Sequence, residues 1–554
     1  MIAPDFDFRH VVNQAPSLQD YNAFTSNQIL QALVNTYGAS WINTPATDFG
    51  AIIGSAALIE MGHLANKHLP VLKTHDRYGN RLDIVEFHPA YHEIMELAIR
   101  HQVHAVSWNN NHSGAYLAHS TLSYLKQQVD EGTSCPITMT FAAVPALRIE
   151  PAIAAEWLPL LLSGHYDPRH IPYFEKKGIT FGMAMTEPQG GSDVRANLTT
   201  ATPTGNGTYR ITGRKWFCSA PMSDAFLVLA QTGKGLSCFL VPRFTPDGIK
   251  NTLFFQRLKD KLGNKSNASG EVEFHQSWAR IIGEEGRGVA AIMEMVRHTR
   301  LDCAVGSAAT MHRAVAEAIH HCRHRNAFGK KLIEQPLMKN VLADLALESA
   351  AATTLGMRLA KGFDDARNDE EAMYFTRIAT AIGKFWNTKR AVAVLGEALE
   401  CIGGNGYVEE SILPRLYRDI PVNAIWEGSG NVQALDVLRA MHKEPECTTA
   451  LMNYFTKAKG LHPALDTQLK ALQQVLADPA AYEFKARIIV EKMALAIQAV
   501  ELIHTAPPDI ATQFCQSRLS TDRHLTWGTL DDDKAADQII HLTHHVFLSQ
   551  IPPV

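Results

Sequence analysis

Residues 204–212 read Thr-Gly-Asn-Gly-Thr-Tyr-Arg-Ile-Thr. The Asn206-Gly207 pair predicts a tight β-hairpin turn, because both residue types tolerate the positive φ angles that such turns need. A second turn signal, Pro-Asp-Gly at 246–248, follows it. Two runs read as buried strands: Ala225 to Gln231 and Leu236 to Val241. Residues 176–282 therefore read as a small β domain.

Helical periodicity occupies the chain on both sides of this β domain. The blocks 1–175, 283–442 and 443–554 have apolar residues at three- and four-residue spacings. We therefore expect four domains: an N-terminal helical domain, the β domain over 176–282, a helical bundle and a C-terminal helical extension. The clearest expected helices are Ile52 to His68, Tyr91 to His104, Val289 to Arg323, Met338 to Gly362, Glu370 to Glu400, Leu465 to Leu476 and Phe484 to His504.

Size, charge and cysteine usage narrow the class of protein. A chain of 554 residues is too long for one core, and a net charge of -4 gives no global basic field for nucleic acid. The eight cysteines are scattered without a Cys-x-x-Cys pair, which is typical of free thiols in a reducing compartment. Residues 1–13 lack a signal-peptide core, and no apolar run reaches the roughly 20 residues of a membrane span. We expect a soluble cytoplasmic protein.

Glu427 is the strongest candidate for a catalytic residue. It lies in the segment Ile-Trp-Glu-Gly-Ser-Gly-Asn over 425–431, before a helix expected over 431–441. A carboxylate beside Trp426 loses hydration, and this raises its pKa toward that of a general base. Free N–H groups at the start of the helix could hold an anion or a carbonyl oxygen, which indicates proton abstraction next to a carbonyl. The alternative is a first-turn helix carboxylate favoured by the helix dipole.

Two segments at the edge of the β domain could bind a ligand. Residues 185–193 read Met-Thr-Glu-Pro-Gln-Gly-Gly-Ser-Asp, where the glycines let backbone N–H groups approach a ligand and Thr186 and Ser192 add hydroxyl donors. Trp216 could stack on a flat heterocycle, with Ser219 bonding its edge. The alternatives are a plain β-turn and a core tryptophan. No Gly-x-Gly-x-x-Gly follows a strand, so a Rossmann site is not expected.

Three groups of histidines have the spacing of metal-ligand pairs on helices. They are His320, His321 and His324; His541, His544 and His545; and His101 and His104. No carboxylate or thiolate completes these groups, so we interpret them as solvated helix faces and expect no metal. The Gly-Gly-Asn-Gly run at 403–406 follows a long expected helix and, as a helix C-cap, needs no ligand.

Taken in order along the chain, these segments resemble the acyl-CoA dehydrogenase flavoprotein family. The order of helical, β and helical domains matches. The 185–193 loop looks like the flavin loop of the family, and Lys-Trp-Phe at 215–217 looks like its flavin-stacking strand. Residues 325–329 are similar to its Arg-x-x-Phe-Gly element. The 403–406 loop resembles its Gly-Gly-x-Gly loop, and 425–429 the segment that carries its catalytic glutamate.

The resemblance implies a fold, a cofactor and a set of site residues. The implied fold is mainly α, with a helical N-terminal domain, a small β-barrel or sandwich middle domain, a C-terminal four-helix bundle and an extra C-terminal helical domain. The implied cofactor is FAD, and Glu427 and Arg300 are the implied catalytic residues. The implied FAD-binding residues are Met185, Thr186, Gly191, Ser192, Trp216, Phe217, Cys218, Ser219, Arg325, Phe328, Gly403, Gly404, Trp426, Ser429 and Asn431.

The implied reaction is the oxidation of an acyl-CoA or a similar small thioester. Glu427 would remove the α-proton while the β-hydride goes to FAD, and the thioester carbonyl would accept hydrogen bonds from the N–H group of the base and from the cofactor. Thr299 stands where some relatives carry an alternative glutamate, so Glu427 is the only candidate base. Two departures concern the cofactor: Gln335-Pro336 replaces an aromatic-Gln pair, and Glu400 replaces a frequent Gln.

Within the family, the chain most closely resembles a branch of bacterial alkylation-response flavoproteins. The segments 134–143, 258–269 and 425–431 are typical of that branch. Its members carry a further C-terminal helical domain that is implicated in duplex DNA binding. The block from residue 443 onward stands in the same place.

The charge of this block predicts weak DNA binding at most. Residues 441–554 hold 10 lysines and arginines against 13 aspartates and glutamates, a net charge of -3. DNA affinity rests chiefly on phosphate neutralisation by basic side chains. Arg439 and Lys443 are the best nearby phosphate partners, although they could equally be helix C-terminal cations that complement the dipole.

Three functions remain open at this point. The first is an FAD-containing flavoprotein of the DNA alkylation response with weak or residual acyl-CoA dehydrogenase activity. The second is a true short- or branched-chain acyl-CoA dehydrogenase with no DNA role, and the third is a flavin-binding scaffold without turnover. Because Arg325 and Phe328 match residues that reach the FAD of a neighbouring subunit, the resemblance also implies a homotetramer built as a dimer of dimers.

Overall fold

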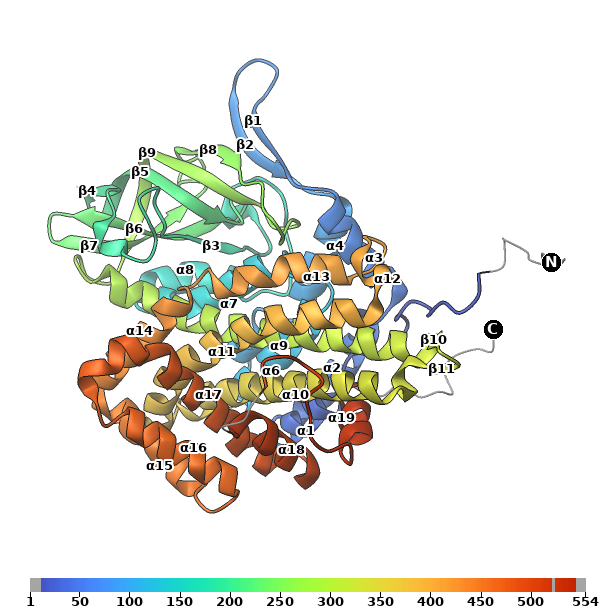
Figure 1. Ribbon diagram of the computed structural model, residues 1–554. Coiled ribbons are helices and arrows are strands. Elements are labelled where there is room, and N and C mark those ends of the chain that lie inside the picture. The colour runs from blue at the N-terminus through green and yellow to red at the C-terminus, as the bar shows by residue number, and fades with distance from the viewer. Residues whose placement is uncertain (1–10, 521–523, 545–554) are drawn as a thin grey trace.

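The computed structural model describes residues 11–520 and 524–544 and shows a small β domain set against a larger helical body (Figure 1). Its N-terminal helices are α1 (Gln28–Thr36), α2 (Asn43–Ile53), α3 (Ala56–Lys67), α4 (Pro89–Arg100), α5 (Val106–Asn109), α6 (Ala115–Gln127), α7 (Ser134–Leu147) and α8 (Pro151–Leu161). The helix expected over Ile52 to His68 is broken at Gly54. A side chain there would clash with the Tyr21 carbonyl, and Ser55 caps the second helix.

A two-stranded hairpin, β1 (Val71–His75) and β2 (Arg81–Glu86), interrupts the N-terminal helices and was not anticipated. It projects beside the β domain (Figure 1). The buried Asp83 fastens it there, because its carboxylate accepts hydrogen bonds from Lys250 Nζ at 2.7 Å and from the Phe255 N–H at 3.0 Å. Charged residues interrupt the apolar alternation of both strands, which explains why the pattern did not predict them.

The β domain is a closed ring of strands, as the expected barrel requires. Strand β6 pairs with β4, β4 with β5, β5 with β9, β9 with β7, and β7 again with β6. The predicted hairpin turn is confirmed, since Asn206 and Gly207 both have positive φ. The strands are β3 (Phe181–Ala184), β4 (Thr200–Gly205), β5 (Thr208–Ser219), β6 (Ala225–Thr232), β7 (Gly235–Pro242), β8 (Leu253–Leu258) and β9 (Ser269–Ile282).

Three long helices follow the β domain and run side by side through the molecule (Figure 1). They are α9 (Gly288–His324), α10 (Pro336–Asp365) and α11 (Glu370–Ile402), and α14 (Gly430–Lys443) packs on α11. The short elements among them are β10 (Asn326–Ala327), β11 (Lys330–Lys331), α12 (Gly404–Tyr407), α13 (Leu413–Asp419) and the 3-10 helix η5 (Ile420–Ala424).

The C-terminal extension packs directly onto these long helices. Its helices are α15 (Pro445–Lys457), α16 (Pro463–Val475), α17 (Tyr482–Thr505), α18 (Pro508–Leu519) and α19 (Ala536–Thr543). Half-buried or buried ion pairs join the two parts: Arg358 with Glu501 at 2.9 Å, and Arg518 with Asp344. The expected mainly α fold, with a β domain between helical parts and a helical extension, is therefore confirmed.

The histidines differ from expectation. His320, His321, His104 and His544 are buried, so the expected solvated faces are wrong for these four, whereas His541 is exposed and His101 and His324 are half-buried. Burial lowers the pKa of the four buried imidazoles. His545 lies outside the described residues.

Three further properties of the chain concern metals, thiols and membranes. Among the described residues, no three His, Cys, Asp or Glu side chains are arranged to hold a metal ion. All eight cysteines are free and buried. Within the described ranges, no helix is both long and apolar enough to cross a bilayer.

Candidate active site

Glu427 lies in a turn between η5 and α14 and is hydrogen-bonded to Thr299 of α9. Its φ angle is 56°, a left-handed conformation that non-glycine residues rarely adopt. Ser429 is the N-cap of α14, so Glu427 stands outside the first turn of that helix. The alternative interpretation as a first-turn helix carboxylate is therefore wrong.

A hydroxyl group from α9 holds the carboxylate of Glu427. Thr299 donates a hydrogen bond to Glu427 Oε2 at 2.6 Å. Burial raises the pKa of Glu427, while the Thr299 hydrogen bond and the charges of Lys384 and Arg300 act in the opposite direction. The net shift is upward, as expected for a carboxylate that serves as a general base.

Arg300 binds the backbone of this turn, whereas Thr299 binds the carboxylate of Glu427. Its Nε donates to the Glu427 carbonyl at 3.2 Å, and its Nη1 pairs with Asp436 at 2.7 Å. Asp436 is also bound by Arg377 at 3.0 Å. Sequence reasoning named Arg300 but missed Asp436 and Arg377, which fix its orientation and carry no motif of their own.

The 185–193 loop is shaped by a buried ion pair. Glu187 accepts hydrogen bonds from Lys215 Nζ at 2.7 Å and from the N–H groups of Leu198 and Thr199 at 2.7 and 3.1 Å. Burial alone would raise the pKa of Glu187, but these donors outweigh it and bring the pKa to about 2. The loop is therefore held by its own contacts, which include a hydrogen bond of 3.0 Å from the Gly190 N–H to the Glu187 carbonyl. The hydroxyls of Thr186 and Ser192 have no hydrogen-bond partner among the described residues.

The end of strand β5 presents side chains of different exposure. The backbone N–H of Trp216 donates to the Thr186 carbonyl at 2.8 Å, which joins β5 to the 185–193 loop. Lys259 Nζ lies 3.3 Å from the centre of the Trp216 ring, so one face of that ring carries a cation. Phe217 is 48% exposed, whereas Cys218 belongs to the core of the β domain. The side chain of Phe217 is thus more open to a ligand than that of Cys218.

The first turn of α14 is bordered by two cations. Arg487, from the C-terminal extension, donates from Nε to Asn431 Oδ1 at 2.9 Å. Lys389 lies so close to Gly430 that a Cβ there would stand 2.8 Å from its Nζ. Neither cation forms an ion pair with a carboxylate among the described residues. Helix N–H groups and two cations together suit an anion such as the pyrophosphate of FAD.

A second group of expected cofactor residues lies far from the first. Arg325 and Phe328 follow the end of α9, about 26 residues and, at ~1.5 Å per residue, roughly 39 Å along the helix from Thr299. Phe328 is 97% exposed. The Gly403–Gly404 loop lies near this segment, because residues 13 and 14 bridge the two. Asn13 accepts a hydrogen bond from the Asn326 backbone N–H, and Gln14 accepts one from Asn405 at 2.9 Å. The second group is thus well separated along α9 from the residue that holds Glu427.

A cleft of about 340 Å³ opens beside α5 and the start of α6. Its lining residues are Ser107, Trp108, Asn110, Asn111, Tyr116, Arg148 and Arg367. The guanidinium of Arg148 lies over the Trp108 ring, and that of Arg367 lies over the Tyr116 ring. Tyr116 is hydrogen-bonded to His298 at 3.0 Å, and His298 precedes the Thr299 that holds Glu427.

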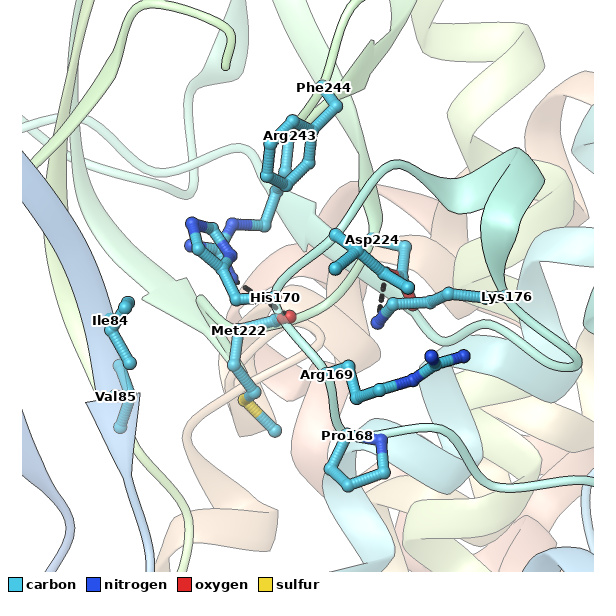
Figure 2. Close-up of a pocket in the computed structure, with 11 residues that line it drawn as sticks. Ile84, Val85, Pro168, Arg169, His170, Lys176, Met222, Asp224, Arg243 and Phe244 are labelled. Carbon is cyan, nitrogen blue, oxygen red and sulfur yellow. Dashed lines mark hydrogen bonds and ion pairs between the residues drawn. The ribbon is translucent and has the colours of Figure 1, made fainter. Parts of the chain in front are cut away.

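A smaller cavity lies between the β1–β2 hairpin and the β domain. Figure 2 shows Arg243, His170 and the Lys176–Asp224 ion pair around it. Its volume of about 30 Å³ leaves room for only one or two water molecules. It is therefore too small for a cofactor or an acyl chain.

Comparison with known proteins covers most of the chain. Family models match the adaptive response protein AidB N-terminal domain over residues 13–168, the acyl-CoA dehydrogenase middle domain over 182–277 and the acyl-CoA dehydrogenase C-terminal domain over 286–442. The AidB protein of Escherichia coli (strain K12) is 44% identical over 513 residues, 92% of this chain and 94% of that protein. The chain belongs to the acyl-CoA dehydrogenase family. Members of this family are FAD-dependent oxidoreductases that act on CH–CH bonds.

Solved structures of acyl-CoA dehydrogenase relatives have the same fold. The crystal structure of Caenorhabditis elegans ACDH-11 in complex with C11-CoA aligns with a TM-score of 0.85 at 26% identity and covers 95% of each chain. An acyl-CoA dehydrogenase from Bacillus anthracis, complexed with FAD, aligns with a TM-score of 0.64 at 19% identity. It covers 78% of this chain and 81% of its own, and at that identity it shows the fold alone.

Proposed function

We propose that this protein is an AidB-like flavoenzyme that oxidises an acyl-CoA thioester at its α,β carbon–carbon bond. The observation that carries the proposal is the Thr299–Glu427 pair. It places a half-buried carboxylate with a raised pKa beside a backbone N–H group that has no acceptor among the described residues. A base and a carbonyl-binding donor in one residue are the two groups that α-proton abstraction next to a carbonyl requires.

The residues of the chain divide the reaction between them. Glu427 removes the α-proton, and its own N–H group donates to the thioester oxygen, which makes that proton more acidic. Thr299 keeps the carboxylate turned toward the substrate, and Arg300 holds the carbonyl of the same residue. When bound, FAD supplies the acceptor for the two electrons that leave the β-carbon.

The large cleft supports a CoA ester as the substrate. Arg148 and Arg367 border it, and each guanidinium lies over an aromatic ring, so the cleft offers both positive charge and flat surface. Phosphates and an adenine ring are the groups that such a surface binds. One cleft residue, Tyr116, is hydrogen-bonded to His298, the sequence neighbour of the Thr299 that holds the base. ACDH-11, which has the same fold, was crystallised with C11-CoA.

The arrangement of cofactor residues favours a complete FAD site between subunits. The first group comprises residues 429–431, which follow Glu427 directly, and the 185–192 loop, which the Trp216 backbone N–H joins to β5. The second, around Arg325 and the Gly403–Gly404 loop, lies at the far end of α9 on exposed loops. We propose that the second group of one subunit completes the site of its neighbour in a homotetramer built as a dimer of dimers.

A role in the DNA alkylation response is a second candidate function, with dehydrogenase activity then weak or residual. It is favoured by the 44% identity with AidB and by two exposed cations, Arg439 and Lys443, at the end of α14. Neither cation forms an ion pair with a carboxylate among the described residues. The net charge of -3 over residues 441–554 limits the expected affinity.

Anaerobic flavin bleaching tests the first proposal. The purified protein is mixed with saturated short, branched and long acyl-CoAs, and the loss of flavin absorbance is followed. We expect bleaching with at least one of them. No bleaching with any acyl-CoA, by a protein that carries FAD, would contradict the enzymatic proposal and favour a flavin-binding scaffold.

A further inference from the structure

The turn that carries Glu427 is held by a buried lysine. Lys384 extends from α11, and its Nζ donates hydrogen bonds to the Trp426 carbonyl at 2.6 Å and to the Gly428 carbonyl. These are the carbonyl groups on either side of the base. Lys384 is 1% exposed and forms no ion pair with a carboxylate among the described residues. The buried ammonium group thus binds two backbone oxygens and no carboxylate among the described residues.

Other side chains complete this arrangement. Gln433, fully buried on α14, donates from Nε2 to the carbonyls of Glu427 and Gly428 at 2.9 and 3.0 Å. Arg300 also donates to the Glu427 carbonyl. Three consecutive carbonyl groups, 426 to 428, are therefore all bound by side chains. Glu427 keeps a left-handed φ of 56° within this clamp, although such a conformation is unfavourable for glutamate.

We propose that Lys384 is a positioning residue that aims the N–H group of Glu427 at the thioester oxygen. The peptide unit between Trp426 and Glu427 is planar and trans, so its carbonyl and its N–H group point in opposite directions. Because the carbonyl points to Lys384, the N–H group points away from it, where no described residue accepts it. This inference rests on the proposed function, since it assigns a task to the same base.

Lys384 has a second, electrostatic effect on the base. Its positive charge lowers the pKa of Glu427 against the upward effect of burial. The other groups that face Glu427 are Thr299 and Arg300, and the buried thiols of Cys135 and Cys303 feel its charge. Removing the ammonium therefore moves the pKa of Glu427 upward, whereas a substitution that keeps the charge leaves it nearly in place.

Two substitutions of Lys384 separate the geometric effect from the electrostatic one. Lys384→Met removes the donor and the charge; Lys384→Arg keeps the charge but changes the reach of the donor. With the best acyl-CoA substrate, we expect Lys384→Met to lower kcat for flavin reduction on the order of 100-fold, as loss of one carbonyl-binding donor does, with little change in KM. The pH at which its rate of flavin reduction rises should also be higher than in the wild type. Lys384→Arg should lower kcat without that displacement of the pH profile.

The control is Lys361→Met, which removes a lysine of α10 that pairs with Asp365 away from the site. It should match the wild type in kcat and in pH profile. Each variant is compared for FAD content and thermal midpoint, so that a loss of folding is recognised. A folded, FAD-loaded Lys384→Met protein with wild-type kcat and pH profile overturns the inference.

If no acyl-CoA reduces the flavin, the proposed function is wrong. The hydrogen bonds of Lys384, Gln433 and Arg300 to the turn, which we call the clamp, can still be tested. The crystal structure of Lys384→Met, which has no donor at this position, then decides. A reversed peptide between residues 426 and 427, or a φ at Glu427 that has left the left-handed region, supports the clamp. An unchanged turn shows that Gln433 and Arg300 hold it without Lys384 and overturns the inference.

Discussion

At the scale of single residues, the site depends on opposing influences on one carboxylate. Burial raises the pKa of Glu427, and a hydroxyl and two cations restrain that rise. A base with a higher pKa takes a carbon-bound proton more readily, but it must still be ionised at the working pH. The neighbours of Glu427 thus set the pH range in which the enzyme can act.

The first prediction concerns the base itself. Glu427→Gln keeps the size of the side chain and a hydrogen-bonding group but removes proton acceptance. We expect no flavin reduction by any acyl-CoA that the wild type oxidises, a loss of at least about 100-fold in rate, while FAD stays bound. The measurement is stopped-flow absorbance of the flavin. Reduction at the wild-type rate would show that another residue is the base.

The second prediction concerns pH. The wild-type rate of flavin reduction should rise with pH through the raised pKa of Glu427, because only the ionised carboxylate accepts the proton. Thr299→Val removes a hydrogen bond that favours the ionised form, so the rise should move to higher pH. A control is Thr376→Val on α11, whose hydroxyl bonds its own helix. A profile of Thr299→Val that coincides with the wild type would refute this account.

At the scale of elements, sequence patterns predicted the helices and strands whose apolar residues recur at a regular spacing. They missed the elements and residues whose place depends on a single contact. The long helices follow their apolar periodicity, and Asn206-Gly207 forms the predicted hairpin turn. The β1–β2 hairpin was missed because the buried Asp83 holds it, and a lone aspartate gives no strand signal. Lys384 was missed for the same reason, since it is one polar residue in a helix of ordinary periodicity.

Motifs named Glu427 and Arg300, which the structure places in contact. The Trp216 backbone N–H binds the 185–193 loop, and Thr299 and Arg300 hold the 425–431 turn against α9. The residues that orient them, such as Glu187 beneath the loop and Asp436 behind Arg300, belong to no short motif. Their roles depend on contacts between segments far apart in sequence, which no local pattern contains.

The third prediction concerns the loop after α9. Arg325→Ala combined with Phe328→Ala should lower the FAD content of the purified protein and shift it from tetramers toward smaller species, since the half-buried Arg325 and the exposed Phe328 are proposed to complete a neighbouring site. Light scattering combined with flavin absorbance measures both quantities. Tyr78→Ala, at another exposed aromatic residue, is the control. A fully FAD-loaded monomer of the wild type would contradict the shared site.

At the scale of the whole molecule, charge and family membership point in different directions on DNA. The resemblance to bacterial alkylation-response flavoproteins leads us to expect binding by the C-terminal extension, whereas a net charge of -3 over residues 441–554 opposes it. We predict weak, sequence-independent binding of duplex DNA that falls steeply with salt. The log–log slope should be about -0.9 for each phosphate neutralised, with only a few phosphates involved.

The double substitution Arg439→Ala and Lys443→Ala tests which surface is involved. It should flatten the salt slope by about one or two units. Lys457→Ala on α15, another cation of the extension, should change it less. Tight binding that resists moderate salt would contradict the electrostatic argument. No binding at low salt would leave the oxidoreductase proposal without a DNA role.

The bond from Arg487 to Asn431 has a consequence for how this architecture could evolve. A residue of the extension reaches the first turn of the helix that follows the base. A lineage that lost the extension would also lose a cation beside the expected pyrophosphate. In lineages that keep the extension, we therefore expect Arg487 and Asn431 to change as a pair.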